Sequence, residues 1–139
     1  MNCVEVPTTL AIARNSPNKL LRTTHPRVPC ALTNLRVGEV QASPSAWSIA
    51  AACAAEAYHV ANGKGIKLDF DDPVRYVKEF GAKIPNARPS MLLDHLAGRR
   101  AEVDNINGAI PREGQKIGIA TPVNSLVVAL LRAKESAFK

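Results

Sequence analysis

The sequence predicts an all-α domain, a bundle of five or six helices. After residue 43, apolar side chains recur three or four positions apart, which is the spacing of one helix face. Several of these stretches open with a capping residue followed by proline, a typical helix start. Apolar and polar residues alternate over residues 66–70, a run too short to build a sheet. The length of 139 residues fits a single domain spanning residues 1–139.

Two helices are expected in the middle of the chain. Ser43 and Pro44 open the first, and Asn62-Gly63 end it. Its helical-spacing positions are Trp47, Ala51, Ala54, Tyr58 and Ala61. Asp72-Pro73 open the second by the same cap logic, with Val74, Val77 and Phe80 on its apolar face.

Three helices are expected in the last 50 residues. One starts at Pro89-Ser90 and stops at Gly98. Another runs from Glu102 to Ile117, and Pro111 inside it is expected to kink or split it. The last starts at Thr121-Pro122, with a buried stripe of Val123, Leu126, Val127 and Leu130.

The first 50 residues differ from the rest in composition. They hold five Lys/Arg against only Glu5 and Glu39, and they are rich in Ser, Thr and Pro. That bias resembles an organellar transit peptide, which is one alternative. Against it, Pro7 and the residues that follow it predict a short helix. Residues 20–42 carry two prolines and a glycine without a sustained period, so we expect them to be irregular.

Charge and cysteine content narrow the classes of function. The net charge is +6, but residues 51–139 interleave 13 Lys/Arg with 10 Asp/Glu. Scattered charge of this kind favours a solvated surface over a nucleic-acid partner, although an anionic substrate also fits it. The three cysteines lack metal-ligand spacing and indicate free thiols in a reducing compartment, so we expect a cytoplasmic protein. No apolar run is long enough to span a membrane.

A few polar groups are candidates for chemistry. Glu102 falls at the edge of an apolar stripe, where it could face a cleft or simply stabilise a helix start. Ser90 could hold a carboxylate or act only as a helix cap. The amides of Asn2, Asn18 and Asn86 lie at turns or ends. His95 is expected at the surface, and no histidine has a metal-ligand partner at suitable spacing.

A set of motifs between residues 89 and 124 resembles the C-terminal domain of ketopantoate reductase (2-dehydropantoate 2-reductase). They are Pro89-Ser90-Met91-Leu92-Leu93-Asp94, Gly98-Arg99, Glu102-Val103-Asp104, Ile106-Asn107-Gly108 and Thr121-Pro122-Val123-Asn124. Their order and spacing both match over about 35 residues. Asn2-Cys3-Val4, Pro7 and Asn15-Ser16-Pro17-Asn18 are similar to the start of that domain, and residues 54–66 to its next helix.

The resemblance implies a fold, a reaction and a set of site residues. The fold would be the helical C-terminal domain of the 6-phosphogluconate dehydrogenase type. In the family enzyme a Rossmann domain binds NADPH, a hydride passes to the keto carbon of ketopantoate, and a lysine protonates the alkoxide. Glu102 would contact substrate and orient that lysine, and Ser90 would bind the substrate carboxylate. Asn2 and Asn18 would line the pocket, with Asn86 beside a family asparagine position.

The departures from the family pattern are specific. The family lysine would lie four residues before Asn2, and no Gly-x-Gly-x-x-Gly motif occurs in the sequence. Val6 and Ala87 stand where the family has asparagines, and Pro111 is unexpected. We therefore expect a chain that binds no NADPH and is inactive alone, needing a Rossmann domain in cis or in trans. The alternative is a non-catalytic helical interaction module, including a homodimer.

Overall fold

The computed structural model describes residues 27–104 and 107–138, and in these ranges helices joined by loops are the only regular secondary structure. These ranges contain seven helices: α3 (Arg27–Thr33), α4 (Val37–Ala42), α5 (Pro44–Gly63), α6 (Pro73–Ala82), α7 (Ser90–Leu96), α8 (Ala109–Lys116) and α9 (Pro122–Glu135). The predicted all-α class is confirmed, and residues 66–70 form no strand. No helix in the described ranges is long and apolar enough to cross a membrane.

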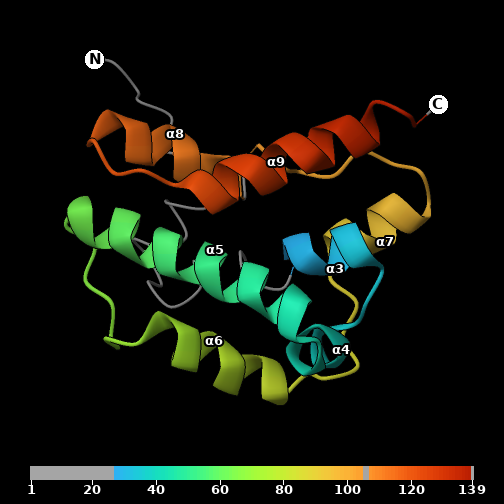
Figure 1. Cartoon of the computed structure of the whole chain (residues 1–139), viewed down its shortest axis with the longest axis horizontal. Helices are drawn as coiled ribbons and strands as arrows, with labels where there is room; N and C mark the ends of the chain where they lie inside the picture. The colour runs from blue at the N-terminus through green and yellow to red at the C-terminus, as the bar shows by residue number, and fades with distance from the viewer. Residues whose placement is uncertain (1–26, 105–106, 139) are drawn as a thin grey trace.

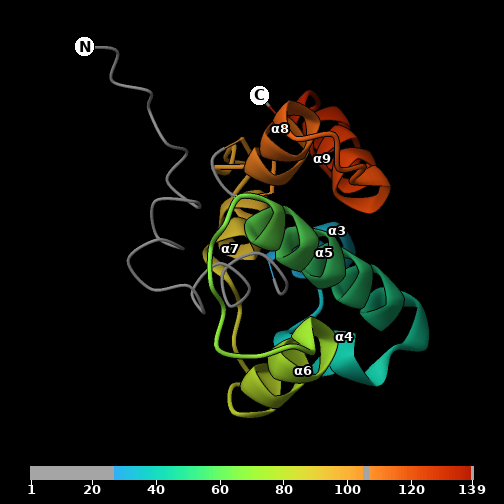
Figure 2. The ribbon, with the colours of Figure 1, turned by 90° about the vertical axis from the view of Figure 1, so that its left-hand side faces the viewer.

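Helix α5 is the centre of the bundle. It packs against α3, α4, α6, α8 and α9. Figures 1 and 2 show α8 and α9 on one side of it and α6 on the other. Close packing is possible because the inward positions of α5 are small: Ala50, Ala54, Ala57 and Ala61 are all fully buried. Of the predicted stripe, Ala54 and Ala61 are buried, whereas Trp47, Ala51 and Tyr58 are half-buried.

Cap residues fix the starts of the two middle helices as predicted. The Ser43 side chain accepts a hydrogen bond from the Ala46 backbone N–H at 3.3 Å. The Asp72 carboxylate accepts one from the Arg75 N–H at 3.0 Å. Each bond satisfies an amide that has no partner inside the helix.

The irregular segment predicted over residues 20–42 is wrong for its described part, which forms α3 and α4. Pro29 does not break α3, because it lies in the first turn, where its missing N–H is not needed. Gly38 lies inside α4 at a close approach, since a Cβ there would be 2.9 Å from Pro85. Pro29 and Gly38 are therefore compatible with these helices, although both residue types are typical of loops.

The helix predicted from Glu102 is also wrong in its extent. Residues 101–104 and 107–108 are not helical, and α8 begins only at Ala109. Pro111 is the third residue of α8, so it lies in the first turn and no kink is required. Ile117, placed on the predicted buried face, follows the end of the helix and is 37% exposed.

The buried face of α9 is rotated from the predicted one. Asn124, Val127, Val128, Leu131 and Glu135 point inward. Leu126 and Leu130 are 60% and 48% exposed. The rotation arises because the interior holds polar partners for Asn124 and Glu135, which a count of apolar spacing does not detect.

Candidate functional site

Two predicted site residues from different segments, Ser90 and Glu102, line the same pocket. The pocket has a volume of about 220 Å³, and its lining is Arg27, Ser90, Met91, Asp94, Ala101 and Glu102. Both Ser90 and Glu102 are solvent-exposed, so they are accessible to a small molecule. We call this the Ser90–Glu102 pocket.

Helices α3 and α7 form one side of this pocket, and they pack against each other. Arg27 is the first residue of α3, and Ser90 is the first residue of α7. The Arg27 Nη1 donates a hydrogen bond to the Ser90 Oγ at 3.1 Å. Burial lowers the pKa of the Arg27 guanidinium, while the nearby negative charge of Glu102 opposes that shift.

The segment after α7 holds Glu102 through its neighbours. Gly98 ends α7 with a positive φ of 70°, a conformation that costs glycine little. Arg99 then donates hydrogen bonds to Asp94. Its backbone N–H donates to the Asp94 carbonyl at 2.8 Å, and its side chain donates to the Asp94 carboxylate at 3.2 Å. Val103 is buried in the core. The segment that carries Glu102 is therefore anchored on both sides, by Arg99 before Glu102 and by Val103 after it.

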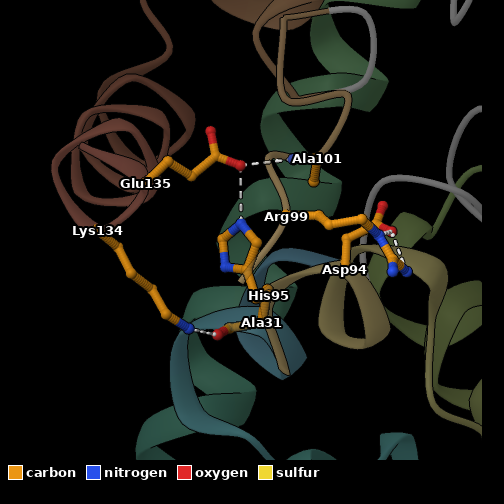
Figure 3. A network of polar contacts seen from close by, with 7 residues as sticks. All are labelled: Ala31, Asp94, His95, Arg99, Ala101, Lys134 and Glu135. Atoms are coloured by element: carbon orange, nitrogen blue, oxygen red, sulfur yellow. Dashed lines mark hydrogen bonds and ion pairs between the residues drawn. The ribbon is translucent and has the colours of Figure 1, made fainter. Parts of the chain in front are cut away.

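The last turn of α9 supplies a further attachment, shown in Figure 3. One oxygen of Glu135, Oε2, accepts hydrogen bonds from the Ala101 N–H at 2.6 Å and from His95 Nε2 at 2.9 Å. His95 is 6% exposed, so its predicted surface position is wrong. Because an ionised carboxylate only accepts, His95 Nε2 is the donor in this contact. The residue next to Glu102 is thereby tied to both α7 and α9.

A second carboxylate, that of the half-buried Glu56, organises the start of α9. Glu56 accepts hydrogen bonds from the backbone N–H groups of Val123 and Asn124, at 2.9 and 2.8 Å. The Asn124 amide also donates to Glu56 at 2.8 Å and to the Cys53 carbonyl at 3.2 Å. These bonds satisfy free amides of the first helical turn, so Glu56 acts as an N-cap supplied from α5. Its role in the fold is structural.

Of the other predicted site residues, only Asn86 lies in the described ranges, and it is not part of the lining of the Ser90–Glu102 pocket. Asn86 is exposed and lines a separate depression with Arg36 and Arg88. Asn2 and Asn18 lie outside the described residues. Their roles remain predictions. Within the described ranges, no group of three or more His, Cys, Asp or Glu side chains could hold a metal ion.

Sequence reasoning missed Arg27, Glu56 and Glu135. Glu56 left a detectable signal, because it is the one acid in an alanine-rich helix. Arg27 left none, since it lies in a stretch that shows no helical period. Glu135 would be found only by knowing that residues 34 positions apart, Ala101 and Glu135, meet in space.

The described residues form an all-helical domain in which two of the predicted site residues, Ser90 and Glu102, line the same pocket. The family model described as the ketopantoate reductase PanE/ApbA C-terminal domain matches residues 12–135. The chain therefore belongs to the ketopantoate reductase C-terminal domain family, which confirms the resemblance found in the sequence.

Curated relatives agree with this assignment. The chain is 39% identical over 106 residues to 2-dehydropantoate 2-reductase of Archaeoglobus fulgidus, a match that covers 76% of the chain and 35% of the relative. Against the enzyme of the same name from Caulobacter vibrioides it is 41% identical over 78 residues, covering 56% and 27%. The chain thus spans about a third of the length of the first relative and about a quarter of that of the second.

Solved structures share the fold. A PanE/ApbA family ketopantoate reductase from Ralstonia eutropha superimposes with a TM-score of 0.80 at 27% identity, covering 90% of this chain and 42% of that one. D-mandelate dehydrogenase, solved with NADH and anilino(oxo)acetate, superimposes with a TM-score of 0.78 at 28% identity, covering 87% and 67%.

Proposed function

We propose that this chain is the substrate-binding domain of an NADPH-dependent 2-dehydropantoate 2-reductase, an enzyme of pantothenate biosynthesis. One observation carries the proposal: Ser90 and Glu102, which lie in the family's motifs, line one accessible pocket despite coming from different segments. The curated relatives named 2-dehydropantoate 2-reductase support the choice of substrate.

In this proposal the residues divide the work as follows. The Ser90 hydroxyl binds the substrate carboxylate, and Glu102 contacts the substrate and orients the general-acid lysine. Asn2, Asn18 and Asn86 add amides to the substrate site. In the complete enzyme NADPH supplies a hydride to the 2-oxo carbon. In this proposal the dinucleotide is held by the Rossmann domain and not by the helical domain.

The Rossmann domain and the lysine would come from outside these 139 residues, in the same polypeptide or in a second one. The 139-residue chain by itself would then bind substrate without turning it over. We expect this reductase to act in the cytoplasm, which fits the two described cysteines, Cys30 and Cys53, being free and buried.

The test is to mix the purified chain with 2-dehydropantoate and NADPH. Chemical shifts at Ser90 and Glu102 should change with 2-dehydropantoate, while absorbance of NADPH stays constant. A Rossmann-domain protein from a relative, added in trans, is the positive arm for activity. Steady NADPH oxidation by the chain alone would contradict the division of labour, and unchanged shifts would contradict substrate binding.

A second candidate is a helical interaction module, for example a homodimer. The exposed apolar face of α9, Leu126 and Leu130, favours it, since large apolar side chains are more often covered. One similar structure is a ketopantoate reductase from Staphylococcus aureus described as dimeric, at 22% identity. Light scattering after size exclusion separates the candidates: a dimer whose shifts at Ser90 ignore 2-dehydropantoate would favour the module.

A further inference from the structure

The Ser90–Glu102 pocket contains a cation that the sequence motifs did not predict. Arg27 lies at the start of α3, its side chain contacts Ser90, and the residue as a whole is half-buried. Its hydrogen bond to Ser90 uses one of the five N–H donors of the guanidinium. The remaining donors form a planar fork that matches a carboxylate.

The direction of this hydrogen bond matters for Ser90. The guanidinium can only donate, so Ser90 Oγ is the acceptor, at 3.1 Å. The hydroxyl proton of Ser90 is not used in this contact and can be donated elsewhere. A carboxylate entering the pocket would then accept from Arg27 and from Ser90 together.

The charges of the residues that line the pocket are a second reason to expect that Arg27 contributes to binding an anion. The lining of the pocket includes two carboxylates, Asp94 and Glu102, and Arg27 is the only basic residue among the described residues that line it. Arg99 lies outside this lining and is paired with Asp94 at 3.2 Å. Without Arg27, an anionic ligand would meet the charge of Glu102 with no compensating cation in the lining, and like charges repel.

We propose that Arg27 is the carboxylate-binding residue of this pocket and sets its specificity for 2-oxo acids over their neutral analogues. This inference rests on the proposed function, because it assigns a role within the same site. Ser90 then acts as the second donor to the carboxylate and is oriented by Arg27. Glu102 is left for the reacting end of the substrate.

The test uses the 139-residue chain and changes both partners of the proposed contact. Arg27 is substituted in the protein, and the carboxylate is replaced in the ligand. Wild type, Arg27→Gln and Arg27→Lys are titrated with 2-dehydropantoate and with its neutral carboxamide. Chemical-shift changes give the dissociation constants. Arg75→Gln is the matched control, since it removes the same charge from an exposed surface pair on α6. Thermal melts of every variant check that it is folded.

Arg27→Gln should weaken binding of 2-dehydropantoate by roughly 10- to 100-fold, the usual worth of a charge-assisted hydrogen bond. The affinity of Arg27→Lys for 2-dehydropantoate should lie between those of wild type and Arg27→Gln, because lysine keeps the positive charge but lacks the planar fork of donors. The carboxamide should bind all variants alike, and Arg75→Gln should match wild type. If Arg27→Gln does not fold, the comparison of the two ligands on Arg27→Lys decides.

Three outcomes would overturn the inference, and they are distinguishable. If wild type binds 2-dehydropantoate and Arg27→Gln binds it equally well, Arg27 is not the carboxylate-binding residue and the proposed function stands. An equal loss of both ligands in a folded Arg27→Gln would likewise contradict it, because a shape effect would explain that loss. If wild type binds neither ligand, the proposed function fails and the inference fails with it.

Discussion

Cys30 and Cys53 are the residues in which burial most changes the chemistry. Both side chains are 0% exposed, and they belong to two separate core clusters. Burial raises the pKa of each thiol to about 12, and the charges of Glu39 and Glu56 act in the same direction. A neutral buried thiol behaves as a small apolar side chain.

We therefore expect Cys30 and Cys53 to resist alkylation. At about pH 8 only roughly one thiol in ten thousand would be ionised at such a pKa, and the thiolate is the reactive form. Iodoacetamide followed by peptide mass spectrometry should find both residues unmodified in native buffer and modified in guanidinium chloride. Rapid native labelling of either cysteine would contradict the burial described here.

How far the sequence predicts the site differs from residue to residue. Ser90 and Glu102 are predictable as candidates because they lie in recognisable motifs, and the structure places both in the lining of one pocket. Arg27 was missed because its contact with Ser90 joins residues 63 positions apart, which no local pattern encodes. His95 was misplaced because one ring in a polar-looking helix end reveals nothing about Glu135, its partner 40 residues later.

At the scale of single helices, α8 is held to α5 by a buried carboxylate. Glu113 is 3% exposed and pairs with Lys64 at 3.2 Å and with Lys116 at 2.8 Å. Burial alone would raise the pKa of Glu113, but the hydrogen bonds from Lys116 and Lys64 outweigh it and hold the pKa below its usual value. The ionised form is thus favoured in the folded protein.

This shift makes a prediction about acid stability. A lowered folded-state pKa stabilises the protein fully above the unfolded-state value, near 4.5, and that stabilisation is lost as the pH falls from this value through the lower folded-state pKa. Glu113→Gln should lower the free energy of unfolding at pH 7 by about 1–2 kcal/mol. The difference from wild type should shrink as the pH approaches about 3.

Urea denaturation at several pH values measures this. Glu79→Gln is the control, because it breaks an exposed pair with Arg75 that is expected to contribute less than about 1 kcal/mol. A difference between wild type and Glu113→Gln that stays constant from neutral to acid pH would show that the ion pairs are not its source.

The elements whose capping residues are local were predictable, and those that depend on tertiary contacts were not. Ser43 and Asp72 cap α5 and α6 where expected. Helices α3 and α4 are short, and they contain Pro29 and Gly38, which are typical of loops, so the sequence does not predict these helices. Helix α9 was found but its face was rotated, because Asn124 is directed inward by Glu56 from another helix.

At the scale of the whole molecule, the alanine faces of α5 set the distances between the packed helices. Ala57 is 0% exposed and belongs to a core cluster with Val60, Val77 and Ile110. Interiors are packed to nearly crystalline density, so added methylenes have no room. Size at this position is therefore constrained from both sides of the bundle.

Ala57→Leu should destabilise the domain by about 1–3 kcal/mol through overpacking. Ala129→Leu is the matched control, because Ala129 is exposed on α9 and leucine is a good helix former. Urea denaturation curves of the two variants give the comparison. Equal stability of Ala57→Leu and Ala129→Leu would mean that α5 has room for larger side chains.

The attachment of Ala101 to Glu135 has a consequence for motion. A helix end frays more easily than its middle, and Glu135 is the final residue of α9. When that turn frays, the Ala101 amide loses its acceptor at the same moment. The turn carrying Glu102 and the end of α9 therefore open as one cooperative unit, and their amides should exchange with solvent deuterium at a shared rate.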